Sequence, residues 1–489
     1  MMKIINKKYL KSTFAVLAAL TIFTGCEDSI EGDVNTNPFS ATVIDPNLLF
    51  PQVIVAGISA QRTIELNAIN IQCQHWTSAI AGVGVFTNPE LYIISPNTTN
   101  NSWNGWFQNG LRNVAQIISL TEANNPTAIS TIGQAQVLRA MTALSTTQVY
   151  GDIPFSEASN PDFPNPNFDS QEDVLRGIAA LCEEAVANLS TNTATADDLL
   201  YGGDIQSWIR FANSLRLKAL MLIANVDPAS VQADIAEVAA LPLIVDSSQD
   251  AQLNYNASVG NENPIWRTLN QFAGGANAFW SSSQVLVDLM NSTNDPRRPA
   301  YFDLDPAGGF SGQPQGGGNG GNFSFISLNT IRPEMPDRYA TAPETNFYLA
   351  EAALLGLISG DANAFYQAGI QESLDFYDGQ PGAISQADKD AFLASPRGSI
   401  TGLAQAVALR MIHEESYVAN FTRGIEAWTD WRRNRVPEFQ LPIAAVLTDV
   451  IRRYQPPLSE LNANPNAPGV VPLLTPMFFE NPGAPSGVQ

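Results

Sequence analysis

Beyond the first 45 residues, apolar and polar positions follow the period of amphipathic helices. From Ile132 to Tyr150, apolar residues recur at spacings of three and four, so they share one face of a helix. Gly151 and Pro154 predict that this helix ends at Tyr150. The same spacing predicts further helices at Pro51–Asn70, Trp103–Glu122, Ser170–Leu189, Ile205–Asn225, Ser282–Asn291, Pro343–Ser359, Ala362–Tyr377, Gly402–Asn420 and Gly424–Arg433.

Alanine is frequent on the faces where these helices would meet, which suggests close packing of helix pairs of the tetratricopeptide type. A strict tetratricopeptide period is not visible in the sequence. Three long stretches without helical period separate or follow the helices: Asn160–Asp169, Gly308–Asn322 and Gln455–Gln489. Long loops on a helical scaffold often contain the residues that bind a ligand, so we expect the binding site to be formed by loops.

The N-terminus has the pattern of a lipoprotein signal. Four of the six lysines lie in the first eleven residues, and the apolar run Ser12–Ile22 follows them. This run is too short to span a bilayer but fits the apolar segment of a secretory signal. The small residues Thr24 and Gly25 precede Cys26, which resembles a bacterial lipobox, although Phe23 stands where leucine is usual.

We therefore expect residues 1–25 to be a signal peptide and Cys26 to be lipidated, so that the protein is held to a membrane by acyl chains alone. Residues 26–45 are predicted to be an acidic tether, and residues 46–489 a single helical domain. The alternative is an ordinary cleaved signal in which the cysteine is incidental.

The charge and the scarcity of some residue types narrow the function. Asp and Glu number 47 against 25 Lys and Arg, a net charge of −22, which disfavours nucleic acid as a partner. Two histidines and three cysteines leave little material for metal or thiol chemistry, so no metal and no cofactor are expected. The HEESY sequence at His413 lacks the second histidine of a zinc motif. No carboxylate pair of a glycosidase stands out among the acids.

Several chemically conspicuous residues are predicted to be structural. Asp152 is expected to cap neighbouring amides after a helix end, and Trp428 and Trp431 share a helix face that should pack into the core. Glu351 is expected to be a buried partner for an arginine of the Arg432–Arg435 cluster. Buried thiols are favoured for Cys73 and Cys182 over a disulfide between them.

Six segments in order resemble the SusD/RagB family of outer-membrane nutrient-binding lipoproteins. They are the tether CEDSIEGDVNTNPFSAT, AQVLRAMTALSTTQVYGDIPFSEA (Ala135–Ala158), WIRFANSLRLKALMLIANVDP (Trp208–Pro228), DPRRPAYF (Asp295–Phe302), NFYLAEAALLG (Asn346–Gly356) and EESYVANFTRGIEAWTDWRRNRVPEF (Glu414–Phe439).

The resemblance implies a mostly α fold, in which tetratricopeptide-like helix pairs form a right-handed scaffold for long irregular ligand-binding loops. It implies a protein that is not an enzyme. Such a cell-surface lipoprotein captures oligosaccharide or polysaccharide and delivers it to a SusC-like TonB-dependent transporter in the outer membrane for import.

Sugar binding needs aromatic faces for the rings, and amide or guanidinium groups for the hydroxyls. Two regions interpreted as loops, Ala79–Asn101 and Asn261–Trp280, supply both. The acidic composition favours a neutral ligand over an acidic glycan, with neutral glucans as the first expectation. The candidate ligand-binding residues are Trp76, Phe86, Asn88, Tyr92, Trp266, Arg267, Phe272, Phe279 and Trp280.

Three alternatives remain open at this point. The same import system could capture peptides, the protein could be a transporter lid without a ligand site of its own, or it could be an envelope hydrolase. The sequence does not identify the sugar or its linkage.

Overall fold

The structure is a computed structural model that describes residues 45–80, 82–189, 197–318 and 320–481. The predicted signal peptide, the lipidation site Cys26 and nearly all of the tether lie outside the described residues. All elements below belong to the part of the chain from Pro46 onward.

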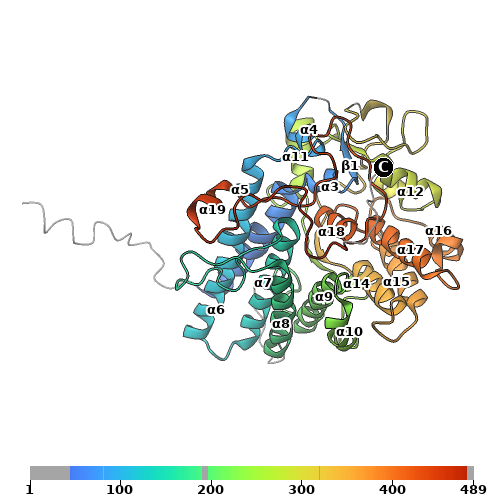
Figure 1. The fold of residues 1–489 in the computed structure, drawn as a ribbon. Helices are drawn as coiled ribbons and strands as arrows, with labels where there is room; N and C mark the ends of the chain where they lie inside the picture. Colours follow the sequence, from blue (N-terminus) through green and yellow to red (C-terminus); the bar gives the residue numbers. More distant parts are fainter. Residues whose placement is uncertain (1–44, 81, 190–196, 319, 482–489) are drawn as a thin grey trace, which may run out of the picture. The chain divides into compact units, whose positions relative to one another are not determined.

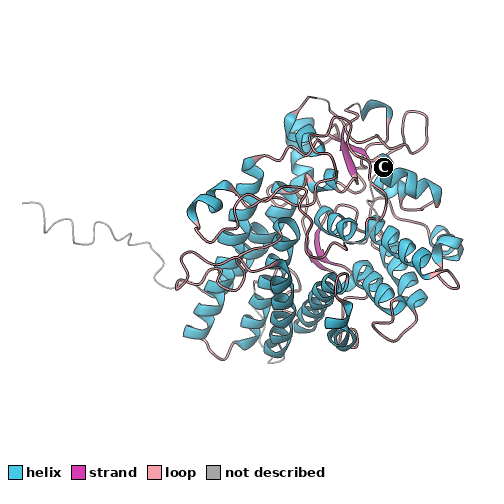
Figure 2. Ribbon diagram, in the orientation of Figure 1, coloured by secondary structure: helices cyan, strands magenta, loops and turns pink. Residues whose placement is uncertain are grey.

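The described part of the chain is mostly helical, as the apolar pattern predicts (Figures 1 and 2). Consecutive helices pack against one another in the tetratricopeptide-like manner: α6 with α7, α7 with α8, α8 with α9, α14 with α15, and α17 with α18. The bounds of these helices are α6 Arg112–Asn124, α7 Ile129–Tyr150, α8 Gln171–Leu189, α9 Ile205–Ala224, α14 Ala342–Leu354, α15 Ala362–Asp375, α17 Gln405–Ala419 and α18 Gly424–Asn434.

Shorter elements complete the fold. The α-helices are α2 Leu49–Gln52, α3 Ile69–Gln72, α4 Gly84–Glu90, α5 Pro96–Asn104, α10 Gln232–Val238, α11 Pro264–Ala273, α12 Gln284–Ser292, α13 Arg298–Tyr301, α16 Gln386–Ala394 and α19 Leu458–Ala463. The π-helices are η2 Val53–Ser59, η3 Gln61–Glu65 and η4 Gly105–Leu111; the 3₁₀ turns are η1 Pro46–Leu48, η5 Pro228–Ser230, η6 Ser247–Gln249, η7 Gly320–Asn322 and η8 Pro396–Gly398. The strands are β1 Trp76–Ser78, β2 Ala251–Leu253, β3 Trp280–Ser282 and β4 Asp337–Ala340.

The end of α7 shows how the sequence sets a boundary. Gly151 follows Tyr150 with φ +80°, a conformation that glycine adopts without steric cost. Asp152 Oδ1 then accepts a hydrogen bond of 2.8 Å from the backbone N–H of Gln171, the first residue of α8. The predicted capping role of Asp152 is confirmed.

The other structural predictions are confirmed as well. Trp428 and Trp431 are fully buried on α18. Glu351 on α14 pairs with the guanidinium of Arg433. Cys73 and Cys182 are buried free thiols, and burial raises the pKa of both.

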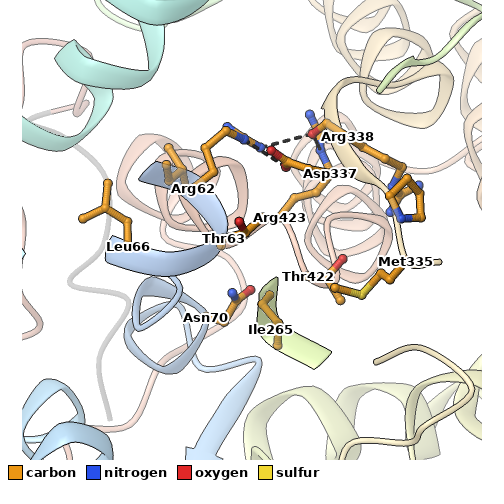
Figure 3. A pocket seen from close by; sticks show the side chains of 13 residues that line it. Arg62, Thr63, Leu66, Asn70, Ile265, Met335, Asp337, Arg338, Thr422 and Arg423 are labelled. Carbon is orange, nitrogen blue, oxygen red and sulfur yellow. Dashed lines mark hydrogen bonds and ion pairs between the residues drawn. The ribbon is translucent and has the colours of Figure 1, made fainter. Parts of the chain in front are cut away.

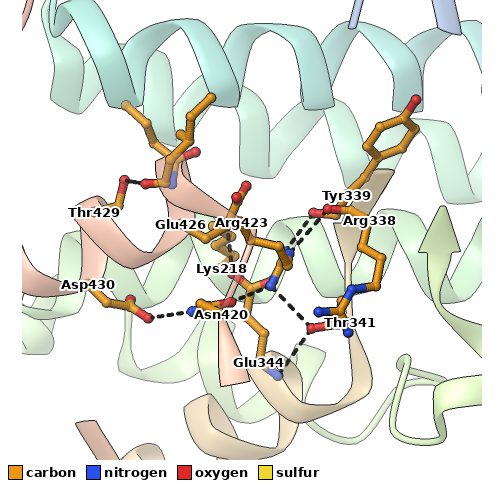
Figure 4. Close-up of polar contacts among 12 residues, drawn as sticks. Lys218, Arg338, Tyr339, Thr341, Glu344, Asn420, Arg423, Glu426, Thr429 and Asp430 are labelled. Carbon is orange, nitrogen blue, oxygen red and sulfur yellow. Dashed lines mark hydrogen bonds and ion pairs between the residues drawn. The ribbon is translucent and has the colours of Figure 1, made fainter. Parts of the chain in front are cut away.

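A buried network of charged residues joins the π-helix η3 to α9, α14 and α18. Figure 4 shows its part around Lys218, Glu344 and Arg423. Arg62 donates to Glu426 at 2.9 Å and to Asp337 at 3.1 Å. Glu344 is 2.8 Å from both Lys218 Nζ and Arg423 Nη2. Because each of these charges is buried, removal of one partner leaves another uncompensated, which costs about 3–5 kcal/mol for a buried pair.

Two predicted loops are partly helical. The sequence interpretation treated Asn261–Trp280 as a loop, but residues Pro264–Ala273 form α11. Within Ala79–Asn101, α4 and the first turns of α5 are helical. The irregular character assigned to these two regions was therefore wrong where α4, α5 and α11 lie, and right for the segments between and beside them.

Candidate functional site

The two regions that carry the candidate residues lie side by side because of one short sheet. Strand β1 pairs antiparallel with β3, with Ser78 opposite Trp280 and Trp76 opposite Ser282. The pairing continues as the backbone N–H of Ala79 donates to the carbonyl of Phe279 at 2.9 Å. Segments some 200 residues apart in sequence are thereby fixed against each other.

Four aromatic rings gather at this pairing. Phe86 of α4 stacks on Phe279 with 4.6 Å between ring centroids and 13° between planes. The Phe86 ring also meets the Trp280 ring edge-on, with 5.9 Å between ring centroids. The centroids of the Trp280 and Trp76 rings are 5.2 Å apart. Each such aromatic pair stabilises the fold by about 0.5–1.5 kcal/mol beyond the contribution of its buried area, so these four rings form a well-packed cluster.

The backbone turn before β3 is held by Asn277. Its side-chain oxygen accepts from the N–H groups of Phe279 (3.2 Å) and Trp280 (3.1 Å). Its amide nitrogen donates to the carbonyls of Trp280 (2.9 Å) and Ile326 (2.8 Å). This one side chain therefore fixes the backbone that carries the Phe279 and Trp280 rings.

A pocket of about 570 Å³ lies beside this cluster and is lined in part by Phe86, Phe279 and Trp280. We call it the aromatic pocket. Its rim includes the exposed apolar side chains of Phe272 (68% exposed), Ile64 (51%) and Val83 (39%). It is lined by Ile64, Glu65, Asn67, Ala68, Ile71, Val83, Phe86, Pro89, Thr98, Thr268, Phe272, Phe279 and Trp280.

Of the nine candidate residues, the structure brings four to the aromatic pocket: Phe86, Phe272, Phe279 and Trp280. Phe272 is the most exposed of these, whereas Trp280 is 1% exposed and lines the pocket from within the core.

The other five do not line this pocket. Trp76 (0% exposed) and Tyr92 (2%) are core residues, so neither has an open face on which a sugar could stack, which corrects the expectation for both. Trp266 is half-buried against the core, and Arg267 and Asn88 are exposed on α11 and α4.

Glu65 is the single charged residue among the described residues that line the aromatic pocket. Burial raises the pKa of the Glu65 carboxyl, while a 3.2 Å hydrogen bond from the Asn101 amide acts in the opposite direction. A ligand that carries a negative charge would meet this carboxylate without a lining cation to offset it.

The sequence interpretation missed the polar lining residues Glu65, Asn67, Thr98 and Thr268. Glu65 and Asn67 lie in the predicted helix Pro51–Asn70, outside the two regions considered for binding. Thr98 and Thr268 lie inside those regions, where only aromatic, amide and guanidinium side chains were considered. For Thr268 a signal existed, because it precedes Phe272 by four residues and so shares its helix face.

The comparison with protein families decides the classification. Residues 38–457 match the SusD-like family model, whose description is "starch-binding associating with outer membrane". The chain belongs to the SusD-like family. No curated protein matches the sequence significantly.

Solved SusD homologues share the fold. One from Bacteroides uniformis superposes with a TM-score of 0.75 at 20% identity, covering 89% of this chain and 99% of that one. A chitin-binding SusD homologue from Flavobacterium johnsoniae gives a TM-score of 0.71 at 22% identity, over 90% and 98% of the two chains. At this level of identity the likeness establishes the mostly helical, tetratricopeptide-like fold of the SusD-like chain.

Two further findings concern the described residues of this SusD-like chain. None of the helices there is both long enough and apolar enough to cross a membrane. In the same residues, no group of three or more His, Cys, Asp or Glu side chains is placed to hold a metal ion.

Proposed function

We propose that the protein is a cell-surface glycan-binding lipoprotein that captures neutral oligosaccharide or polysaccharide in the aromatic pocket. The observation that carries this proposal is the convergence of Phe86, Phe272, Phe279 and Trp280, from two distant parts of the sequence, on one pocket. The exposed ring of Phe272 and the half-buried ring of Phe86 offer apolar faces to a pyranose, with the buried rings of Phe279 and Trp280 behind them. The hydroxyls and amide of the lining can bond its hydroxyl groups. The family description and the chitin-binding homologue support a carbohydrate ligand.

The composition of the pocket supports binding without turnover. A glycosidase places two carboxyl groups on either side of the scissile bond, about 5–10 Å apart. Among the described residues that line the aromatic pocket, Glu65 is the one acid. We therefore assign no catalytic residue.

We also propose that lipidated Cys26 holds the protein on the outer membrane and that the bound glycan passes to a SusC-like TonB-dependent transporter. The lipobox-like sequence before Cys26 and the family's association with the outer membrane support this arrangement. Labelled palmitate should enter the wild-type protein and not Cys26→Ser, and equal labelling of the two would reject the anchor.

Calorimetric titration with starch and chitin oligosaccharides, together with uronate and peptide ligands, tests the binding function. Phe272→Ala should weaken binding of the preferred neutral glycan by about tenfold or more, because loss of an aromatic anchor typically costs about 2 kcal/mol. Its matched control is Phe163→Ala, which removes a ring that is 43% exposed and does not line the pocket.

Equal loss in both variants, or none in Phe272→Ala, would place the site elsewhere. Binding of a peptide with no binding of any glycan would replace glycan capture by peptide capture.

A further inference from the structure

A second open pocket, of about 560 Å³, lies where the segment after β2 meets two loops. Gln252, Asn254 and Tyr255 come from β2 and its continuation. Arg332 comes from the loop before β4, and Phe376 and Gln380 come from the end of α15 and the turn beyond it. We call it the amide pocket, because three of these side chains are carboxamides.

The polar groups of the amide pocket are held in hydrogen-bonded pairs. The Arg332 guanidinium donates to Gln380 Oε1 and, at 2.5 Å, to the carbonyl of Asn329. Gln380 Nε2 donates to the carbonyl of Phe376 at 2.6 Å, and Gln252 Nε2 donates to Asn254 Oδ1 at 2.9 Å. Planar amides and guanidinium groups present both donors and acceptors, which match hydroxyl groups that donate and accept.

Aromatic area lies beside these polar groups. Phe376 is half-buried, and the guanidinium of Arg338 stacks on its ring, with 3.8 Å from Cζ to the ring centroid. Tyr255 is also half-buried, and the side chains of Ser59 and Thr63 interact with its hydroxyl. The amide pocket therefore combines supported rings with fixed donors and acceptors, the combination that a saccharide requires.

The two pockets are connected through the elements that line a third, small cavity, which Figure 3 shows. This cavity has a volume of about 20 Å³, room for about one water, and its lining includes Thr63, Ile265 and Pro336. Pro336 also lines the amide pocket. On η3, Thr63 is next to Ile64, and on α11, Thr268 comes three residues after Ile265. Ile64 and Thr268 both line the aromatic pocket.

We propose that the amide pocket is a second saccharide subsite, so that the preferred ligand is a chain long enough to fill both pockets. The inference rests on the proposed glycan-binding function and adds to it the length of the ligand and a second set of contacts.

The test measures affinity by calorimetry for the linear chito- and malto-oligosaccharides, from the disaccharide to the octasaccharide. Affinity of the wild-type protein should keep rising with length beyond the shortest chain that fills the aromatic pocket. The double variant Arg332→Ala/Gln380→Ala should bind the octasaccharide about tenfold more weakly and flatten this rise, whereas Phe272→Ala should weaken short and long chains alike. Arg176→Ala/Gln386→Ala, at side chains on α8 and α16 that line neither pocket, is the matched control.

Gln252→Ala/Asn254→Ala provides an independent pair, on β2 and the residue after it, if the first variant loses its helical circular dichroism. An affinity that stops rising at the shortest bound chain, or an octasaccharide affinity untouched by both double variants, would overturn the second subsite and leave the proposed function intact. Failure of the wild-type protein to bind any saccharide would instead reject the proposed function, and the subsite with it.

Discussion

At the scale of single residues, Glu65 is the feature that should decide which sugars enter the aromatic pocket. It is half-buried, and no basic residue lines the pocket with it among the described residues. Two like charges a few Å apart repel by about 1–4 kcal/mol, depending on how much water screens them. Because Glu65 is partly exposed, water screens this repulsion, and we expect it to weaken the binding of an acidic sugar by about tenfold.

Glu65→Gln should therefore bring the affinity for an oligogalacturonate about tenfold closer to that for the preferred neutral oligosaccharide. The amide keeps the size of the side chain, so the neutral ligand should be affected little. Calorimetry of both ligands gives the ratio, with Glu122→Gln, an exposed glutamate of α6, as the control. An unchanged ratio would mean that Glu65 does not face the bound sugar.

At the scale of elements, the structure separates what local pattern can predict from what it cannot. Helix α7 was predicted to within three residues, since its apolar period, Gly151 and Pro154 are all local signals. Helix α11 was missed although its signals were also local: an Asn263 cap, Pro264 at the first turn and Gly274 in the left-handed conformation at the end. Its aromatic residues Trp266 and Phe272 were instead interpreted as ligand contacts in a loop.

The candidate site was predictable in its residue types and not in its geometry. That Phe86 and Phe279 would stack depends on the register of β1 against β3, a pairing between segments some 200 residues apart. Burial of Trp76 follows from the same pairing, and nothing in its neighbourhood along the sequence distinguishes it from the exposed Phe272.

The N-terminal cap of α11 gives a prediction at this scale. Asn263 Oδ1 accepts from the N–H of Ile265, and Asn263 Nδ2 donates to the carbonyl of Met335, each at 2.8 Å. Asn263→Ala removes both bonds from a fully buried site, which should cost about 1–3 kcal/mol of stability. Because α11 carries Thr268 and Phe272, glycan affinity should fall with it.

Chemical denaturation and calorimetry measure the two effects of Asn263→Ala. Asn263→Ser is the informative comparison, since it keeps a cap oxygen for the N–H of Ile265 and loses the donor to Met335. It should recover part of the stability. Full affinity in a destabilised Asn263→Ala protein would show that the position of α11 does not control the aromatic pocket.

At the scale of the whole molecule, the buried ion pairs should govern stability in acid. Burial acts to raise the pKa of Glu351, but the charges of Arg433 and His413 outweigh it and lower that pKa from 4.5 to about 2. For Glu426 burial is likewise outweighed, by Arg62, Lys218 and Arg423, and its pKa also falls. Since the folded state holds these carboxyls ionised, their contribution is complete above about pH 4.5 and is lost as the pH falls toward 2.

Two other buried carboxyls act in the opposite sense at higher pH. Burial raises the pKa of Asp250 and of Glu90 to about 7, against the smaller opposing effects of Arg338 on Asp250 and of backbone N–H groups on Glu90. Their ionisation in the folded state is unfavourable relative to the unfolded chain, so they remove stability as the pH rises from about 4 to about 7, where the loss is complete. Stability should accordingly be greatest near pH 4.5, where the two windows meet.

The free energy of unfolding, measured with urea from pH 2.5 to 8.5, should fall on both sides of this maximum. Two substitutions test which carboxyl groups cause each decline. Glu351→Gln lowers stability at neutral pH, because Arg433 loses its buried partner, and should flatten the decline between pH 4.5 and 2.5. Glu90→Gln should flatten the decline between about pH 4.5 and pH 7, because the amide has no charge to bury. Glu334→Gln, at an exposed position, should leave both sides unchanged. An acid limb of equal slope in wild type and Glu351→Gln would show that protonation of the buried ion pairs does not drive acid unfolding.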